Sequence, residues 1–273
     1  MPFTHLTIVM PAYNEAEGIR GFIEELREHV APLAERLSFV VADDRSTDDT
    51  AVVLSDLPDV DVQTQPANRG HGPTALAAYQ AGIALSPDAL VHIDGDGQFL
   101  GHDVARLVAA LEATGADVVH GVRGGRTDPW YRKALTAAVG LLVAASCGRR
   151  VPDVNTPLRG YRPAAAETLV DAVPADALVP HVHFSLAEAR GGFLVRYVRV
   201  ASIPRRGASA SGTMWGRGAG LRLPPKRLRV FARDALAEVW RLSLRPSAPL
   251  RSIRRTSPTS SGPTSSGPTA SGS

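Results

Sequence analysis

Short apolar runs alternate along the chain with longer stretches in which apolar residues recur at helical spacing. Each run has the length of one buried strand, and each longer stretch suits a helix with one buried face. The expected strands are residues 6–10, 37–42, 60–64, 89–93, 117–122 and 193–203. The expected helices are residues 15–30, a segment from about 47, 73–85, 103–115, 134–148, a segment from 163, 181–192 and 224–243. The alternation predicts an α/β fold, with a mostly parallel sheet that helices cover on both faces.

A polar cluster follows each of the first five expected strands. In chain order the clusters are PAYNE, DDRSTDD, NRGHG, DGDGQ and RGGR. Any one of them is compatible with ordinary turn chemistry, because turns are rich in Asp, Asn, Gly and Pro. The carboxyl ends of parallel strands meet at one edge, however, and ligands of such sheets bind in the crevice beyond that edge. Five clusters at one edge therefore predict a binding site there.

The fourth cluster contains acids at alternate positions, Asp94 and Asp96, followed by Gln98. In an extended chain alternate side chains share a face, so three oxygen groups would be directed at one point. Carboxylate and amide oxygens suit a hard divalent cation. We therefore predict a metal site rather than a plain Asp/Gly turn.

The 273 residues are 44% apolar, enough to bury a sizeable core. The single cysteine, Cys147, excludes a disulfide framework or a cysteine metal site within one chain, which fits a reducing compartment. The N-terminus MPFTHLTIVMPAYNE has no charged region typical of a secretory signal, so we expect a cytosolic chain. The apolar residues 134–148 are shorter than the roughly 20 needed to span a bilayer, and we interpret them as a buried helix.

Charge is distributed unevenly, although the net charge is only +3. Between Gly216 and Arg255 there are eleven basic and two acidic residues, which leaves 19 basic and 25 acidic elsewhere. The Ser/Thr/Gly/Pro segment after Arg255 cannot bury enough apolar surface to offset its ordering entropy, so we expect it to be disordered.

The helix expected at 224–243 is amphipathic. One side carries an apolar stripe of Leu228, Phe231, Ala235, Val239 and Leu242. Another side carries Lys226, Arg229 and Arg233 at helical spacing. One interpretation is that the stripe packs on the protein and leaves a solvated basic face. The other is that the basic face, with the arginines beyond it, holds the protein on an anionic membrane, at about 1 kcal/mol per well-placed charge.

Eight blocks, taken in order, resemble the family 2 glycosyltransferases with a GT-A fold, and among them the polyprenyl-phosphate (dolichol-phosphate) mannosyltransferase branch. The blocks are VMPAYNEAEGI, VADDRSTDDT, NRGHG, HIDGDGQF, GVRGG, WYRKALT, DVNTPLRGYR and RRGAS, and they cover residues 5 to about 210. The resemblance implies a single Rossmann-like GT-A domain over residues 1–215, with a nucleotide-sugar half to about 125 and an acceptor half from about 126. The basic helix would then span 216–245 and the disordered tail 246–273.

The resemblance implies a donor site and a metal site. The donor nucleotide would be bound by Pro11, Ala12, Tyr13, Glu15, Asp43, Asp44, Asp94 and Gly95. A Mg²⁺ or Mn²⁺ ion held by Asp94, Asp96 and Gln98 would take up the charge of the leaving diphosphate. The alternative is helix capping, in which Ser46 would cap the helix after this turn and Asp48 and Asp49 would suit its N-terminal dipole. It does not explain Asp43 and Asp44, which end a buried strand where a carboxylate needs a partner.

The resemblance also implies residues for the phosphates and the acceptor. These are Arg123, Arg132 and Thr136 for phosphates, and Asp153, Arg159 or Arg162, Arg205, Arg206 and Ser209 for the acceptor side. Asp96, Arg123 and Arg132 are the expected catalytic residues, and an arginine fork suits phosphate oxygens. The spacing of RRGAS does not decide between Arg205 and Arg206. We interpret His71, His181 and His183 as structural.

The predicted activity is inverting transfer of a hexose, mannose or glucose, from a nucleotide diphosphate sugar to a polyprenyl phosphate. A phosphate acceptor is already anionic and needs no general base, whereas a hydroxyl acceptor does; Asp176 and Glu188 would be the fallback bases. The enzyme would be cytoplasmic, peripheral at the inner face of the cell membrane, and without a nucleic-acid partner. Two alternatives stay open: a family 2 enzyme that uses a sugar or natural-product hydroxyl, and a non-catalytic nucleotide-binding or membrane-associated scaffold. A dinucleotide enzyme is disfavoured, because no three-glycine fingerprint follows the first strand.

Overall fold

The computed structural model describes residues 2–124, 130–207 and 226–255, and for residues 130–136 and 138 it describes the backbone alone. The strands are β1 (Phe3–Ala12), β2 (Ala34–Asp43), β3 (Val60–Thr64), β4 (Ala89–His92), β5 (Val118–Gly124), β6 (Arg159–Tyr161) and β7 (Val195–Ala201). The α-helices are α1 (Ile19–Val30), α2 (Thr50–Ser55), α3 (His71–Ala84), α4 (Gly101–Thr114), α5 (Trp130–Cys147), α6 (Pro163–Ala172), α7 (Pro180–Gly191) and α8 (Lys226–Val239). Shorter helices are η1 (Ala31–Leu33), the π turn η3 (Trp240–Leu244) and η4 (Pro249–Ser252).

The strands form one seven-stranded sheet in the order β3-β2-β1-β4-β6-β5-β7. All neighbouring pairs are parallel except those of β6, which runs antiparallel to both β4 and β5. Every expected strand is present, and the prediction of a mostly parallel sheet is confirmed. Strand β6 was not predicted; it is three residues long and lies inside DVNTPLRGYR.

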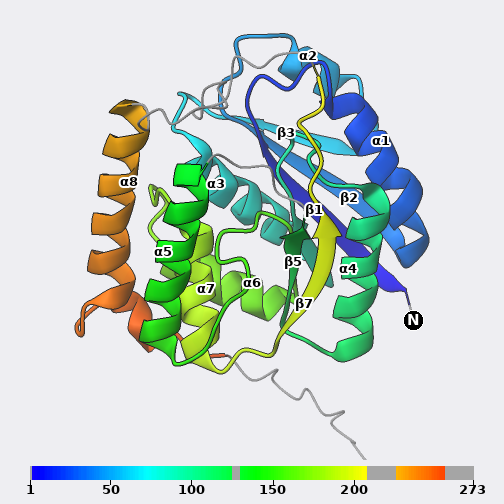
Figure 1. Cartoon of the computed structure of the whole chain (residues 1–273). Coiled ribbons are helices and arrows are strands. Elements are labelled where there is room, and N and C mark those ends of the chain that lie inside the picture. The colour runs from blue at the N-terminus through cyan, green and yellow to red at the C-terminus, as the bar shows by residue number, and fades with distance from the viewer. Residues whose placement is uncertain (1, 125–129, 208–225, 256–273) are drawn as a thin grey trace, which may run out of the picture.

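Two helical layers cover the sheet (Figure 1). One core cluster packs α1 and α4 on one face, and a second packs α3, α6 and α7 on the other. A third, smaller cluster joins α5 and α8 to α7. Helix α1 illustrates the local cause: its buried residues, Ile19, Phe22, Ile23, Leu26 and Val30, recur at three and four positions, so one apolar stripe faces the sheet.

Two predictions need correction. Residues 134–148 are helical but not a buried helix, because Leu141 is 73% exposed whereas Val143 is buried. The expected disordered tail begins too early at 246, because Leu250 packs in the second core cluster and Arg255 forms an ion pair with Asp117 at 2.7 Å. Residues 256–273 lie outside the described part of the chain. In that part no helix is both long and apolar enough to cross a bilayer.

Candidate active site

The polar clusters converge where the strand order reverses, between β1 and β4. From β1 the chain builds the sheet outward through β2 and β3, and then β4 pairs with the other side of β1. Backbone hydrogen bonds join the clusters directly: Gly95 N–H donates to Pro11 O (3.1 Å), and Asp44 N–H donates to Ala12 O (2.9 Å). Such a switch point opens a crevice beyond the carboxyl ends of the strands. The predicted convergence at this edge is therefore confirmed for PAYNE, DDRSTDD and DGDGQ, whereas half of RGGR lies outside the described residues.

The two acids that end β2 are both buried and both have partners. Asp43 accepts from the backbone N–H and the hydroxyl of Ser46. Asp44 accepts from the backbone N–H groups of Arg69 (2.7 Å) and Gly70 (2.9 Å), so it holds the NRGHG loop in place. Ser46 does not cap α2, because its hydroxyl accepts instead from the Asn14 N–H. A contact of either acid with a nucleotide base remains a prediction.

The fourth cluster differs from the extended geometry expected. Strand β4 ends at His92, and Gly95 and Asp96 form a turn, followed by Gly97 at φ +66°. Gln98 donates its backbone N–H to Asp96 Oδ1 (3.1 Å). In the described part of the chain no three His, Cys, Asp or Glu residues form a group that could hold a metal ion by themselves. A cation here would need oxygen ligands from a bound diphosphate as well.

Asp94 and Asp96 nevertheless form a site with the character that a cation requires. Asp94 Oδ1 is buried and has no hydrogen-bond partner in the described structure. Burial, and then the charge of Asp94, raise the pKa of Asp96 to about 6. Two acids in this state repel each other, and a divalent cation would relieve both the repulsion and the unsatisfied oxygen. The residues present therefore fit the metal that the sequence predicts.

Glu15 and Arg205 form an ion pair beside these acids. The carboxylate lies 2.8 Å from Arg205 Nη2, and that guanidinium group also donates to Asn14 O (2.8 Å). Burial raises the pKa of Glu15 to about 8; Arg205 opposes this shift, and Asp96 and Asp94 add to it. The pair thus connects the PAYNE cluster to the segment after β7, across the candidate site.

Arg206 has a different environment. It forms an ion pair with Glu25, donates to Gly97 O (3.0 Å) and Phe99 O (3.2 Å), and lies over the ring of Phe22. Its guanidinium is thereby engaged in holding the loop that carries Asp96. Both arginines of RRGAS are therefore engaged by protein groups, Arg205 beside Asp94 and Asp96 and Arg206 below the loop that carries Asp96, and which of them contacts substrate remains a prediction.

On the acceptor side, Arg123 and Asp153 meet. Arg123 Nε lies 2.8 Å and Nη2 3.0 Å from the two carboxylate oxygens, a bidentate pair. The structure therefore brings together a residue predicted to hold phosphates and one predicted for the acceptor side, although they are 30 positions apart. The side chains of Arg132 and Thr136, and all of Ser209, lie outside the described residues, and their roles remain predictions.

The prediction that Arg159 binds the acceptor needs correction. Its side chain is 0% exposed, so it cannot bind an acceptor phosphate in this structure. The guanidinium donates to three carbonyl oxygens and to Ser185 Oγ, and it lies 3.4 Å from Glu188 Oε1. Arg162, the alternative, lies over the ring of Phe3 and donates to Leu111 O. Both arginines of DVNTPLRGYR thus have structural environments.

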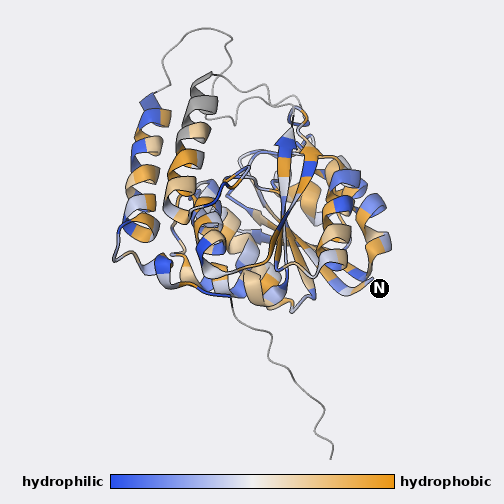
Figure 2. Ribbon diagram, turned by 60° about the horizontal axis from the view of Figure 1, so that its bottom comes forward, coloured by the Kyte–Doolittle hydropathy of each residue, from blue (hydrophilic) through white to orange (hydrophobic). Residues whose placement is uncertain are grey.

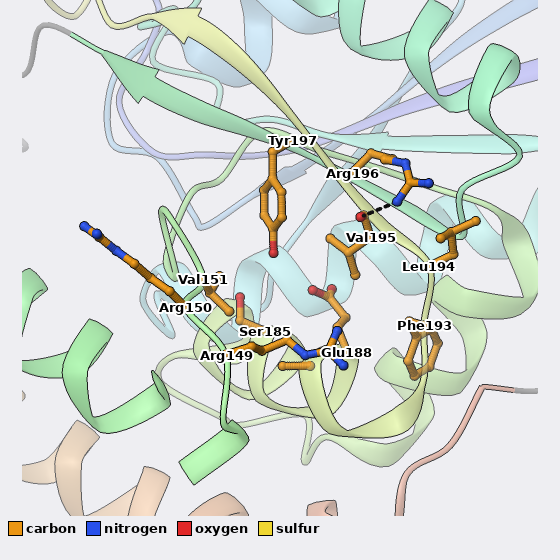
Figure 3. Close-up of a pocket in the computed structure, with 11 residues that line it drawn as sticks. Arg149, Arg150, Val151, Ser185, Glu188, Phe193, Leu194, Val195, Arg196 and Tyr197 are labelled. Carbon is orange, nitrogen blue, oxygen red and sulfur yellow. Dashed lines mark hydrogen bonds between the residues drawn. The ribbon is translucent and has the colours of Figure 1, made fainter. Parts of the chain in front are cut away.

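Glu188 is engaged in the same buried network. His120 Nε2 lies 2.8 Å from Glu188 Oε2. Burial raises the pKa of Glu188, but the charges and hydrogen bonds of His120 and Arg159 outweigh burial and lower it. Glu188 also lines a cavity of about 190 Å³ between α7, β7 and residues 149–151, where Ser185, Tyr197 and Glu188 turn their oxygens toward the same space (Figure 3). Asp176, the other fallback base, is exposed.

The histidines divide into one site neighbour and two core residues. His71 Nε2 lies 3.6 Å from Asp94 Oδ1, so the NRGHG loop contributes an imidazole to the candidate site. In the sequence, the position of His71 inside the NRGHG cluster was the signal that could have placed it at this site. His181 and His183 are buried, and His183 bonds Ser243 Oγ (2.7 Å) and Glu238 Oε1 (3.0 Å), which fastens α7 to α8 and η3. The structural interpretation is confirmed for these two residues, whereas His71 lies next to the candidate site and a role for it there would be a hypothesis.

The family model "Glycosyl transferase family 2" matches residues 7–168, more than half of the chain. The chain belongs to glycosyl transferase family 2. The family 2 chain is 28% identical, over 183 residues, to the undecaprenyl-phosphate 4-deoxy-4-formamido-L-arabinose transferase of Serratia proteamaculans, a match that covers 66% of this chain and 55% of the relative. The transferase of the same name from Proteus mirabilis is 27% identical over 179 residues, 64% of this chain and 54% of the relative. The match thus spans about half the length of these relatives.

Among solved structures, the family 2 chain resembles glucosyl-3-phosphoglycerate synthase from Mycobacterium tuberculosis. The complex with Mn²⁺, uridine diphosphate and glucosyl-3-phosphoglycerate aligns with a TM-score of 0.59 at 20% identity, covering 87% of this chain and 79% of that one. The complex with Mn²⁺, uridine diphosphate and phosphoglyceric acid also has a TM-score of 0.59, at 21% identity. At this identity the likeness concerns the fold, and the predicted GT-A fold and family are confirmed.

Proposed function

We propose that this family 2 enzyme transfers a hexose, with inversion, from a nucleotide diphosphate sugar to a polyprenyl phosphate, and that it needs Mg²⁺ or Mn²⁺. The observation that carries the proposal is the buried Asp94 Oδ1, which accepts no hydrogen bond in the described structure, next to Asp96 at the switch point of a GT-A sheet. The names of the curated relatives, which act on undecaprenyl phosphate, support the acceptor class. The Mn²⁺ in the similar solved structures supports the metal.

The donor would bind across the carboxyl ends of β1, β2 and β4. The loop that Asp44 holds would border the nucleotide, with Pro11, Ala12 and Tyr13 on one side. Asp94 and Asp96 would hold the cation, which when bound would stabilise the negative charge of the departing diphosphate. Arg205, close to both acids through its pair with Glu15, would contact the diphosphate.

The acceptor phosphate would be bound by Arg123, which Asp153 orients through the bidentate pair, and by Arg132. A phosphate oxygen attacks without prior deprotonation, so this reaction requires no general base. The pairing of Glu188 with His120 and Arg159 supports the same choice, since it leaves that fallback base committed to the core. The basic face of α8 would keep the enzyme peripheral on the anionic inner face of the cell membrane, where such acceptors are embedded.

The test is a matrix of donors and acceptors. GDP-mannose, UDP-glucose and UDP-N-acetylglucosamine are each incubated with the protein, with and without polyprenyl phosphate, and with Mn²⁺, Mg²⁺ or EDTA. We expect product only when lipid phosphate and metal are both present. Asp96→Ala should lose transfer and most Mn²⁺ binding while it keeps its melting temperature, because without metal it removes one of two neighbouring acids that repel each other. Asp171→Ala, an exposed acid on α6, is the matched control and should behave as wild type.

The alternatives give different results in the same matrix. Transfer to a soluble sugar in the absence of lipid would favour a hydroxyl acceptor and refute the polyprenyl phosphate. Nucleotide binding without consumption of any donor would favour a non-catalytic scaffold. Full turnover in excess EDTA would refute the metal requirement.

A further inference from the structure

Exposed apolar side chains are concentrated on one pair of helices. Among the described residues eight large hydrophobic side chains are exposed, and five of them lie on α5, α8 and η3. These five, here called the apolar face, are Leu141, Leu142, Val230, Leu236 and Trp240. The two segments are about 90 residues apart in the chain, but α5 and α8 stand side by side beyond the sheet (Figures 1 and 2). Exposed apolar residues gathered on two adjacent helices, rather than scattered singly over the molecule, favour an interaction surface.

The apolar face is not the side by which α8 packs on the protein. The packing side consists of Leu228, Ala235 and Val239, all of them buried. Glu238 fixes that side further, because it accepts from the backbone N–H groups of Leu178 and Val179 as well as contacting His183. The packing side of α8 is complete without Val230, Leu236 and Trp240. These three side chains therefore point outward, and packing within the chain does not explain why they are apolar.

The same outward side is strongly basic. Lys226, Arg227, Arg229, Arg233 and Arg241 are all exposed there. Of the two acids in α8, Asp234 pairs with Arg233 at 2.8 Å and Glu238 is buried. Alternation of exposed arginines with tryptophan and leucine is typical of helices that lie in a membrane interface, because long basic side chains reach the headgroups while apolar ones enter the acyl boundary.

We propose that the apolar face inserts into an anionic bilayer, with Trp240, Leu236 and Leu141 below the headgroups and the α8 arginines among them. This inference rests on the proposed function, because a polyprenyl phosphate acceptor is what would bring the enzyme to a membrane. It adds which surface of the protein contacts that membrane. A second copy of the chain fits less well as the occupant, because two such faces would bring like charges together. The N-terminal ends of α5 and α8 lie at the end of the molecule where β5 and β7 finish (Figure 1), so a bilayer on this face borders the acceptor side.

Insertion and electrostatic attraction respond differently to salt. Salt screens the arginines, with a Debye length of about 8 Å at physiological ionic strength, but it does not weaken burial of apolar side chains. Wild-type protein should therefore sediment with vesicles of phosphatidylcholine and phosphatidylglycerol at low salt and remain partly bound at high salt. A purely electrostatic contact would be released completely, which would overturn the inserted face.

The decisive variant is Trp240→Ser combined with Leu141→Ser, both at exposed positions, so the melting temperature should not change. Its vesicle partition coefficient should fall about tenfold or more, and the salt-resistant fraction should disappear. Val52→Ser, at an exposed apolar residue on α2, is the matched control and should bind as wild type. If the double variant binds vesicles as well as wild type does, insertion of the apolar face is refuted.

Activity on a short, water-soluble prenyl phosphate separates this inference from the proposed function. The double variant should turn over that acceptor at the wild-type rate, because neither residue belongs to the candidate site. If wild type uses the soluble acceptor but does not bind vesicles at any salt concentration, the proposed function is supported and membrane insertion of the apolar face is refuted. If vesicle binding depends on Trp240 but no prenyl phosphate is glycosylated, the face stands and the function fails.

Discussion

Replacing Arg159 with methionine tests whether this arginine belongs to the core or to the acceptor site. Methionine is apolar and flexible enough to occupy much of the same space. The substitution removes hydrogen bonds to the carbonyl oxygens of Val154, Thr156 and His181, between 2.8 and 3.1 Å long, and the contact with Glu188. All of these groups are buried, so water cannot replace the guanidinium.

The expected loss of stability is large. Removing one partner of a buried charge pair costs about 3–5 kcal/mol, because the remaining charge is left uncompensated. The contact with His120 stays and makes the lower end of that range the better expectation. For a domain of typical stability, about 5–15 kcal/mol, this is a substantial fraction of the free energy of unfolding.

The measurement is urea unfolding of wild type and Arg159→Met at two pH values. Glu188 has a lowered pKa in the wild type, so it contributes stability above its ordinary pKa that is lost as the pH falls through the lowered value. Without the guanidinium, Glu188 and His120 bind protons more readily in the folded state. The deficit of the variant should therefore be greater near pH 8 than near pH 5.

One result would contradict the assignment of Arg159 to the core. If Arg159→Met unfolds at the wild-type urea concentration but has lost transfer, with a raised KM for the acceptor, then Arg159 contacts substrate and the buried network is not its role. Arg162→Met provides a comparison from the same motif; its guanidinium has one carbonyl partner, so its cost should be smaller.

Three further predictions concern the contacts around the site. Arg205→Ala should raise the donor KM at least tenfold and should also lower the free energy of unfolding, because it leaves the buried Glu15 without its ion-pair partner. Arg206→Ala should lower the free energy of unfolding by about 2 kcal/mol with a smaller effect on the donor KM, since it loses charged hydrogen bonds to the metal loop. Steady-state kinetics distinguish the two variants. Gly72→Ala should destabilise the protein by about 1–3 kcal/mol, because the new methyl group would lie 2.2 Å from Ala177 O, and an unchanged urea midpoint would contradict this packing. Glu238→Ala should speed trypsin cleavage after the arginines of α8, because it removes the acceptor of two backbone N–H groups and the helix then detaches and unfolds more readily. A cleavage rate equal to wild type would show that the apolar stripe alone holds α8.

The strands and most helices could be predicted because their signals are local. A run such as LTIVM or ALVHI identifies a buried strand without knowledge of its neighbours, and the parallel arrangement follows from the alternation with helices. Strand β6 could not be found in this way. It has three residues, and its partners β4 and β5 lie about 70 and 40 positions away in the chain. Long-range pairing, rather than its own sequence, makes it a strand.

The sequence by itself determined the α/β class, the family, the edge of the sheet where the polar clusters meet, and the acids that suit a cation. It did not determine which of several similar charged residues faces the site. Arg159 carries the same charge as Arg205, yet one is sealed in the core and the other lies beside Asp94 and Asp96. Residue type gives the chemistry a side chain can perform, but its burial and partners come from segments distant in the chain. The tertiary structure therefore decided the surroundings of each arginine, and it also placed α5 and α8 side by side.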